Sequence, residues 1–191
     1  VSAGGGLTEH LSNHGAKHFT LPIAKKNFLA IKQYKNLRDI YREFKPDIIH
    51  VRSRFPAWIN VLALKGLPSS KPIVISTFHG LYSKPFYSKS MSYADDIIAI
   101  SKTVQEYVLK NYDVDHSRVH LIYRGCDVDE FNTSVPSEAW SNSWYKEFPQ
   151  TSNKILLTLP GRITGWKGIE DFLKLLSQLD QAKYHGLIPG P

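Results

Sequence analysis

Two cations beside glycines in the segment 159–168 have the types and spacing that favour binding of a diphosphate. Arg162 follows Gly161, and Lys167 precedes Gly168. The first N–H groups of a helix are unpaired and attract anions, while glycine lets a phosphate come close to the backbone. Because a helix is expected directly after Gly168, we predict that Arg162, Lys167 and Gly161 form a diphosphate site. Solvated surface charges are the alternative, since loop cations often have no ligand.

Two further cations follow a predicted buried strand at residues 47–51. Arg52, Ser53 and Arg54 come directly after this apolar run, and Pro56 then favours the first turn of a helix. In an open parallel sheet, ligands gather beyond the carboxyl ends of the strands. We therefore predict an anionic ligand near Arg52 and Arg54, and two solvated or ion-paired arginines are the alternative.

His79 comes at the carboxyl end of another predicted strand, residues 72–77. A lone histidine beside an aromatic is often a structural residue, so this position alone does not assign a role. The segment 82–93 that follows holds several aromatics among serines and lysines. Such a segment can stack on nucleic-acid bases, but we predict an irregular stretch and a helix that pack the aromatics inward.

Three histidines near the beginning of the chain, His10, His14 and His18, recur at a spacing that would place them on one face of an unbroken helix. Gly15 interrupts that helix, and Glu9 is the one acidic or thiolate side chain close to the three. We therefore expect surface histidines and no metal site.

Strand-like and helix-like segments alternate along the first two thirds of the chain. Short apolar runs are each followed by a stretch with helical periodicity. The expected strands are residues 47–51, 72–77, 96–100 and 119–122, and the expected helices include residues 27–44, 56–64 and 102–111. This alternation favours an α/β fold with a doubly wound, parallel, Rossmann-like sheet.

Residues 132–153 differ in composition, since Ser, Pro, Asn and Trp dominate them. We interpret them as a linker that contains one short helix, capped by Ser137. The linker would separate a first domain at residues 1–131 from the beginning of a second domain at residues 154–191. The second domain opens with the strand, loop and helix that carry the predicted diphosphate site.

The composition describes a globular chain with a basic charge. Of the 191 residues, 42% are hydrophobic, which is enough for a packed core. The formal net charge of +7 attracts phosphates, nucleic acid or an anionic membrane surface, and it does not choose among them. A single cysteine, Cys126, excludes an internal disulfide and fits a reducing compartment. We find no apolar run of membrane-spanning length and expect a cytoplasmic protein.

The wording of the segment 160–168, P-G-R-I-T-G-W-K-G, resembles one enzyme family. It is similar to the loop that opens the second domain of the two-Rossmann-domain (GT-B) sugar transferases of glycosyltransferase family 4. In that family the arginine and lysine of this loop hold the diphosphate of a nucleotide-sugar donor. The resemblance therefore implies this role for Arg162 and Lys167, and it covers nearly the whole chain.

Two motifs of the first domain extend the resemblance to the acceptor and the reacting sugar. H-V-R-S-R-F-P-A-W looks like members that act on cell-envelope polysaccharide, and it implies acceptor contacts for Arg52, Ser53 and Arg54. T-F-H-G is similar to the loop in which a histidine approaches the reacting sugar, and it makes His79 the catalytic candidate.

A third motif, Y-R-G-C-D-V-D-E-F at residues 123–131, resembles the last segment of the family's first domain. Asp127 and Asp129 within it also match the D-x-D metal ligands of a different class of sugar transferases. That chemistry needs Mg²⁺ or Mn²⁺ on carboxylates at a strand end, whereas this pair lies in a turn that the family uses to cross between domains. We therefore predict metal-independent transfer with no cofactor.

Together, the resemblance implies a retaining glycosyltransferase in cell-envelope polysaccharide or lipopolysaccharide synthesis. Its partners would be a nucleotide-sugar donor, a glycan or lipid-linked acceptor and the inner membrane surface as a peripheral contact, with no nucleic acid. Two alternatives stay open: a non-catalytic module that binds nucleic acid or another polyanion, and a nucleotide-sugar epimerase of the same fold. Compared with complete family members the chain would be truncated at both ends, and we expect its 191 residues alone to be inactive or nearly so.

Overall fold

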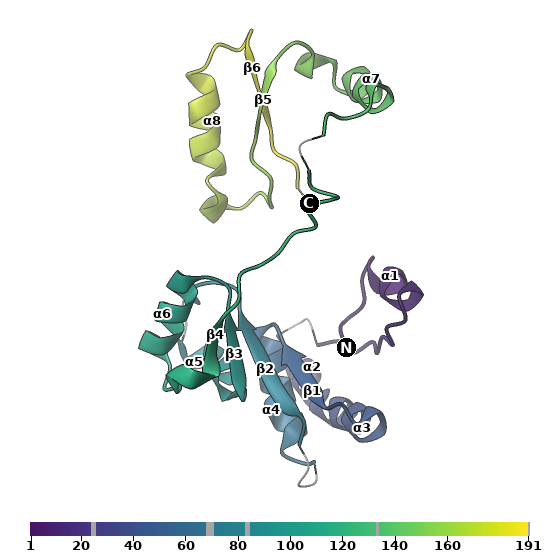
Figure 1. Cartoon of the computed structure of the whole chain (residues 1–191), viewed down its shortest axis with the longest axis vertical. Helices are drawn as coiled ribbons and strands as arrows, with labels where there is room; N and C mark the ends of the chain where they lie inside the picture. Colours follow the sequence, from purple (N-terminus) through teal and green to yellow (C-terminus); the bar gives the residue numbers. More distant parts are fainter. Residues whose placement is uncertain (24–25, 68–70, 83–84, 133, 191) are drawn as a thin grey trace. The chain divides into compact units, whose positions relative to one another are not determined.

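The computed structural model describes residues 1–23, 26–67, 71–82, 85–132 and 134–190. The chain folds into two compact units, Val1–Cys126 and Asp127–Pro191, each with its own parallel sheet (Figure 1). The division lies directly after Cys126. Residues 132–153, interpreted from the sequence as a linker, contain a helix and lie inside the second unit.

The first unit alternates strands with helices, as the sequence predicts. Its helices are α1 (Thr8–Asn13), α2 (Phe28–Lys32), α3 (Tyr34–Phe44), α4 (Arg54–Leu64), α5 (Pro85–Ser88) and α6 (Lys102–Asn111), with the 3₁₀ helices η1 (Lys89–Tyr93) and η2 (His116–Arg118). Its strands are β1 (Ile48–Val51), β2 (Ile73–Phe78), β3 (Asp96–Ala99) and β4 (Val119–Leu121). The prediction of an α/β fold with a parallel, Rossmann-like sheet is confirmed.

The four strands lie in the order β1-β2-β3-β4, and every neighbouring pair is parallel. Each crossover moves one place in the same direction, and such crossovers are right-handed, so the described connections lie on one face of the sheet. This covered face packs against α4, η1 and α6. The buried residues of the covered face recur with a period of two, and they are Ile49, Val51, Val74, Ser76, Phe78, Ile97, Ala99 and Val119. Thr77 of β2 is also buried, on the opposite face.

The opposite face of the sheet is more open. Ile48 and Ile73, which are partners across β1 and β2, are 56% and 52% exposed. Further along the same face lie His50 on β1 and Thr77 on β2. This face therefore presents apolar residues where the strands begin and polar side chains near their carboxyl ends.

A second apolar cluster joins α3 to α4. It consists of Leu21, Ile23, Leu37, Ile59 and Ala63. Beside it, the hydroxyl of Tyr41 on α3 donates a hydrogen bond of 2.7 Å to Oδ1 of Asn60 on α4. Asn60 is buried, so this bond satisfies a polar group inside the packed layer.

The helix expected at residues 27–44 is instead two helices, because the chain turns at Gln33 between α2 and α3. The end of α3 is as expected. Lys45 adopts a left-handed conformation with φ of +48°, and Pro46 follows, which cannot continue a helix.

The aromatics of the segment 82–93 were expected to pack inward, but not all of them do. Phe86 is 83% exposed, whereas Tyr82 packs against the main core. In its described residues, 82 and 85–93, the segment forms the two short helices α5 and η1, which are too short to present a long apolar stripe.

The second unit contains one strand-helix-strand crossover. Its elements are α7 (Glu138–Glu147), η3 (Pro149–Thr151), β5 (Ile155–Thr158), η4 (Gly165–Lys167), α8 (Ile169–Ser177) and β6 (Tyr184–Leu187). β5 and β6 pair in parallel with Ile155 opposite Tyr184. The expected cap of α7 is present, since the side chain of Ser137 accepts the backbone N–H of Trp140.

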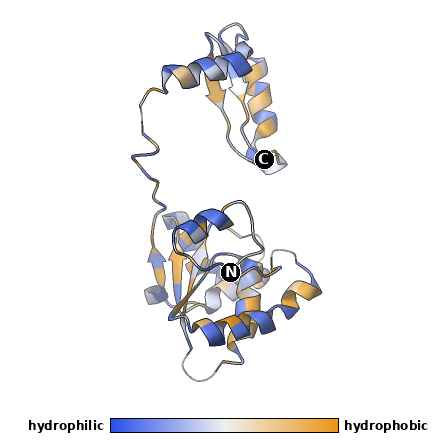
Figure 2. Ribbon diagram, turned by 90° about the vertical axis from the view of Figure 1, so that its right-hand side faces the viewer, coloured by the Kyte–Doolittle hydropathy of each residue, from blue (hydrophilic) through white to orange (hydrophobic). Residues whose placement is uncertain are grey.

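Much of α8 consists of hydrophobic residues, which are orange in Figure 2. The helix lies close to β6 because Gly186 has no side chain: a Cβ there would overlap Leu176. The first strand, loop and helix of this unit thus have the order that the sequence predicts. No helix among the described residues has the length and apolar character that crossing a bilayer requires.

Candidate functional site

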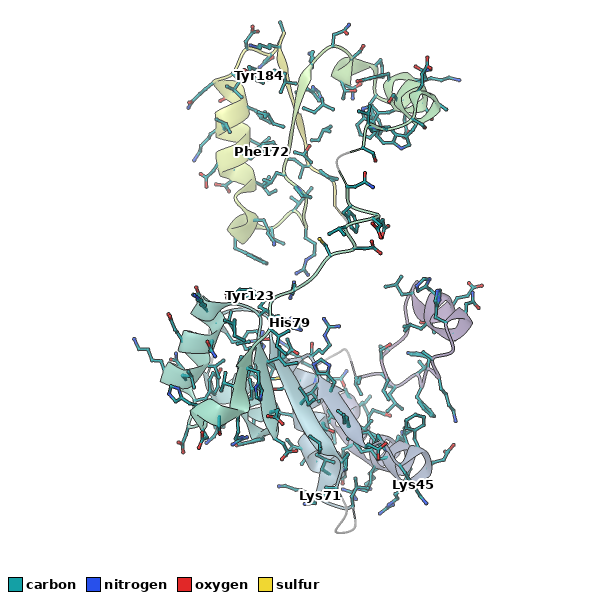
Figure 3. The ribbon with its side chains drawn as sticks, in the orientation of Figure 1. Lys45, Lys71, His79, Tyr123, Phe172 and Tyr184 are labelled. Atoms are coloured by element: carbon teal, nitrogen blue, oxygen red, sulfur yellow. The ribbon has the colours of Figure 1, made fainter. Side chains whose placement is uncertain are left out.

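A pocket of about 470 Å³ opens at the carboxyl ends of the strands of the first unit, and we call it the strand-end pocket. Its walls are His50, Arg52, Thr77, His79, Ile98, Ile100, Ile122, Arg124 and Gly125. His79 lies at the carboxyl ends of the strands, whereas Lys45 and Lys71 lie at the opposite end of the sheet, where the strands begin (Figure 3). The pocket therefore occupies the place where open parallel sheets bind ligands.

Arg124 orients the ring of His79. Nη2 of Arg124 lies 2.8 Å from Nδ1 of His79. A guanidinium N–H can only donate, so Nδ1 must accept and the proton of the neutral ring is on Nε2. The backbone N–H of His79 donates to the hydroxyl of Tyr82 at 3.2 Å, which ties down the loop. His79 is thus held with its Nε2–H to offer to a ligand.

The surroundings of both pocket histidines favour their neutral forms. Partial burial is the largest cause that lowers the pKa of His79, and the charge of Arg124 is the next. Arg52 and His50 act on the pKa of His79 in the same direction. Partial burial and then Arg52 also lower the pKa of His50, whose Nε2 lies 2.7 Å from Oγ1 of Thr77. Near neutral pH the positive charge of the pocket therefore resides on the two arginines.

A larger groove of about 750 Å³ runs beside the edge strand β1, and we call it the edge groove. Its lining includes Arg52, Ser53 and Arg54, the three residues expected to contact an acceptor. His50 and Arg52 line both the edge groove and the strand-end pocket. The two hollows therefore adjoin each other along the carboxyl end of β1.

The two arginines of the edge groove have different surroundings. Arg54 is half-buried, and its guanidinium lies 4.6 Å from the ring centroid of Tyr82 and 5.1 Å from that of Tyr87. These aromatic faces attract the cation and hold it in place. Arg52 is exposed, and none of the ion pairs found among the described residues includes it. Arg52 is therefore the more available cation for a ligand.

The loop between β5 and α8 has a backbone that depends on its glycines. Gly161 has φ of +150° and Gly168 has φ of +70°, values that residues with a side chain rarely adopt. α8 begins directly after Gly168, as predicted, with Glu170 and Asp171 in its first turn. The unpaired N–H groups at the start of α8 thus follow the loop without an intervening residue.

Lys167 folds back over the beginning of this loop. Its Cδ and Cε lie 3.9 and 4.0 Å from the position that a Cβ of Gly161 would take, and its Nζ lies 4.3 Å from the ring centroid of Trp166. Arg162 is exposed. In the part of the chain that the structure describes, neither cation belongs to an ion pair. Both charges are therefore available to an anion.

The segment after β6 supports the same loop. The backbone N–H of Gly161 donates to the carbonyl of Pro189 at 2.9 Å. A Cβ on Gly190 would collide with the carbonyl oxygen of Gly161, so the two backbones are in direct contact. The position of Gly161 thus depends on chain that lies beyond α8.

The carboxylate of Asp127 is used within its own turn. Its Oδ1 accepts the backbone N–H of Asp129 at 3.0 Å and that of Glu130 at 3.2 Å. Among the described residues, no three His, Cys, Asp or Glu side chains lie close enough together to hold a metal ion. His10, His14 and His18 therefore form no such group.

Two pocket residues, His50 and Arg124, are not among the site residues predicted from the sequence. Arg124 follows β4, and the rule that ligands gather beyond the carboxyl ends of parallel strands would have pointed to it. His50 lies inside β1, and only the sheet register and its pairing with Thr77 place it in the pocket.

Comparison with known proteins agrees with this architecture. A model of the family described as Glycosyltransferase Family 4 matches residues 2–130. An uncharacterized glycosyltransferase of Methanocaldococcus jannaschii is 32% identical over 94 residues, which are 47% of this chain and 22% of that protein. A crystallised glycosyltransferase of Rickettsia africae ESF-5 has a TM-score of 0.76 and 28% sequence identity, over 98% of this chain and 50% of that one. The chain therefore spans half the length of the crystallised relative and a smaller share of the archaeal one.

Proposed function

Since residues 2–130 match its family model, the chain belongs to glycosyltransferase family 4, and we propose that it serves to move a sugar from a nucleotide-sugar donor to a glycan or lipid-linked acceptor. Both relatives described above carry the name glycosyltransferase. Because the chain spans half of the crystallised relative, we propose turnover for a protein that also contains the rest of such an enzyme. The 191 residues alone are expected to bind ligands with little or no turnover.

The diphosphate of the donor is proposed to lie at Arg162, Lys167 and Gly161. The observation that carries this assignment is that Lys167 folds back over Gly161, beside the first N–H groups of α8. When the bond to the sugar breaks, negative charge grows on the departing diphosphate oxygen. Fixed cations and helix N–H groups stabilise that charge and so lower the barrier.

The acceptor is proposed to lie in the edge groove, against Arg52, Ser53 and Arg54. The groove is lined by cations together with aromatic and aliphatic side chains, a mixture that suits a glycan or an acceptor with a lipid part. His79 is proposed to contact the reacting sugar. Its neutral ring would donate from Nε2 to a sugar oxygen, and the bond from Arg124 keeps Nδ1 from acting as a base.

We further propose a GT-B enzyme that retains the configuration of the sugar and uses no metal ion or cofactor. The turn that contains Asp127 supports the metal-independent part, because its carboxylate already accepts two backbone N–H groups. Cell-envelope polysaccharide or lipopolysaccharide synthesis at the cytoplasmic face of the inner membrane is the proposed setting. The net charge of +7 would favour a peripheral contact with anionic lipid there.

Calorimetric titration of the purified chain with a panel of nucleoside diphosphates tests the donor site. We expect saturable binding of at least one of them. Arg162→Ala and Lys167→Ala should each weaken this binding by about tenfold or more, because each removes a charge-assisted contact. The matched control is Lys174→Ala, an exposed lysine of α8 outside the loop. Equal affinities for the loop variants and the control would remove the donor assignment.

The same samples separate the alternatives. Affinity for single-stranded nucleic acid that falls steeply with salt, without saturable binding of a nucleoside diphosphate, would favour a polyanion-binding module. An epimerase needs no acceptor, so conversion of a nucleotide sugar in the absence of acceptor would favour that enzyme class.

A further inference from the structure

The strand-end pocket gathers positive charge, and none of the described residues that line it is a carboxylate. Arg52 follows β1 and Arg124 follows β4, and both line the pocket. Its lining includes no Asp or Glu, and the ion pairs found in the described parts of the chain include neither arginine. After partial burial, the groups that lower the pKa of His79 are Arg124, Arg52 and His50, and none of them is a carboxylate. Like charges held together in one hollow are stabilised by an anionic ligand.

The rest of the lining strengthens the attraction for an anion. Ile98, Ile100 and Ile122 contribute apolar surface to the pocket. Apolar walls exclude water from part of the pocket, and because both guanidinium groups are exposed, this strengthens their attraction for a bound anion only moderately over that in open water. Arginine also presents its N–H groups in a planar fork, which matches two oxygens of a phosphate.

We propose that the strand-end pocket is an oxyanion site that takes a phosphate-type group, held by Arg52 and Arg124 beside the ring of His79. This site lies wholly in the first unit, whereas the loop with Arg162 and Lys167 lies in the second. The existence of the site does not depend on the proposed transfer reaction. The transfer reaction bears only on which molecule carries the oxyanion. That group is either a phosphate on the acceptor or the diphosphate of the donor.

The position of His79 gives this site a measurable signature. Arg124 holds Nδ1 as an acceptor, and the hydrogen bonds found among the described residues leave Nε2–H without a protein partner. The neighbouring positive charges disfavour a charged ring while the pocket is empty. A bound anion supplies negative charge, and so it raises the pKa of His79 from its lowered value.

Inorganic phosphate is the first probe. The chain is labelled with ¹⁵N-histidine and titrated with phosphate while the ring signals are followed by NMR. We expect saturable shifts at His79 and His50 and a rise in the pKa of His79. His185 on β6 of the second unit should show no comparable shift.

Variants then test which side chains hold the anion. Arg52→Gln and Arg124→Gln should each weaken phosphate binding by about tenfold, as expected for loss of a charge-assisted contact. Both residues are exposed, and circular dichroism checks that the variants fold. The matched control is Arg42→Gln on α3, whose partner is Asp39 at 3.1 Å and which should leave the affinity unchanged.

A final titration identifies the source of the oxyanion. Phosphate is added to the chain saturated with the nucleoside diphosphate that binds best. A further shift of His79 assigns the pocket to a phosphate of the acceptor, and loss of the phosphate response assigns it to the donor, so both outcomes support an oxyanion site.

The proposal is overturned if phosphate causes no saturable shift at His79, or if the Arg52→Gln/Arg124→Gln double variant binds phosphate as tightly as the unchanged chain. The Arg162→Ala/Lys167→Ala double variant keeps the two proposals separate. It should lose nucleoside diphosphate binding and retain the phosphate shift at His79. If the unchanged chain shows the phosphate shift at His79 but binds no nucleoside diphosphate, this site is supported and the donor assignment is removed.

Discussion

At the scale of single residues, the charged neighbours of His79 decide its chemical role. Arg124 donates to Nδ1, and partial burial of the ring, followed by the positive charges around it, keeps the pKa of His79 low. A histidine in these surroundings is a hydrogen-bond donor near neutral pH and a poor general base. The sequence motif around His79 implies contact with a sugar, and the structure adds the tautomer in which that contact would be made.

The same lowered pKa values make the stability of the first unit depend on pH. The unfolded chain takes up protons at its histidines near pH ~6.5, before the folded chain does so at His50 and His79. The free energy of unfolding is therefore expected to fall as the pH decreases below about 6.5. Urea unfolding across this range measures the dependence, and His79→Gln should reduce it.

The control for this measurement is Tyr145→Phe, which alters an exposed residue of α7 in the second unit and no histidine. It should leave the pH dependence as it is. A stability that does not change across the range, or that rises towards acid, would contradict the positive surroundings assigned to His50 and His79.

At the scale of elements, contacts between neighbouring segments fix the positions of the edge groove in the first unit and of the loop after β5 in the second. The bond between Tyr41 and Asn60 ties α3 to α4, and α4 in turn begins at Arg54 beside the edge groove. In the second unit, the contact of Gly190 with Gly161 fixes the loop after β5. Each of these contacts joins segments that are far apart in the sequence.

Tyr41→Phe is expected to lower the free energy of unfolding by about 1–3 kcal/mol, because it leaves the buried Oδ1 of Asn60 without its partner. Urea unfolding measures the change. Tyr41→Phe combined with Asn60→Leu should recover part of it, since no buried polar group is then left unpaired. The exposed Tyr145 of α7 supplies the control, and its change to Phe should have little effect.

Gly190→Ala is expected to weaken binding of a nucleoside diphosphate, because the added methyl group would push the carbonyl of Gly161 away and shift the loop. Gly6→Ala, outside this loop, is the control, since a Cβ at that position meets nothing within 4 Å. Calorimetric titration compares the two variants. Similar affinities for both would show that the contact between Gly190 and Gly161 does not shape the site.

At the scale of the whole molecule, the two units differ in how much they bury. The first has a continuous core between the sheet and α4, η1 and α6. In the second, Thr151 is buried, while no described residue of α8, β5 or β6 is. The resistance of a segment to local opening follows from its buried contacts, so the two units are expected to differ in local stability.

Hydrogen-deuterium exchange tests this difference. The amides of β2 and β3 should exchange slowest, because these central strands have hydrogen-bonded neighbours on both sides and lie over the core. The amides of β5 and β6 should exchange faster. A nucleoside diphosphate should slow exchange in the loop before α8 if it binds there. Equal protection of the two sheets would contradict the expected order.

The sequence by itself determined most of the local elements of both units, although residues 27–44 form two helices and not one. A buried parallel strand needs a short apolar run and a helix start needs a cap, and both signals lie within a few neighbouring residues. The strands β1 to β5, the end of α3 before Pro46 and the cap of α7 by Ser137 could be predicted for this reason. The roles of Arg162 and Lys167 remain predictions, although the loop that holds them has the expected form.

Only the tertiary structure decided which strand ends meet. His79 and Arg124 are 45 residues apart in the sequence, and they touch because β2, β3 and β4 are adjacent in one parallel sheet. Strand order and register follow from the packing of whole elements against a shared core, which no short motif encodes. The same packing places His50 beside Thr77 and lays Arg54 over two tyrosine rings. Local sequence patterns could therefore predict which elements the residues belong to, but they could not predict that these residues combine into one pocket.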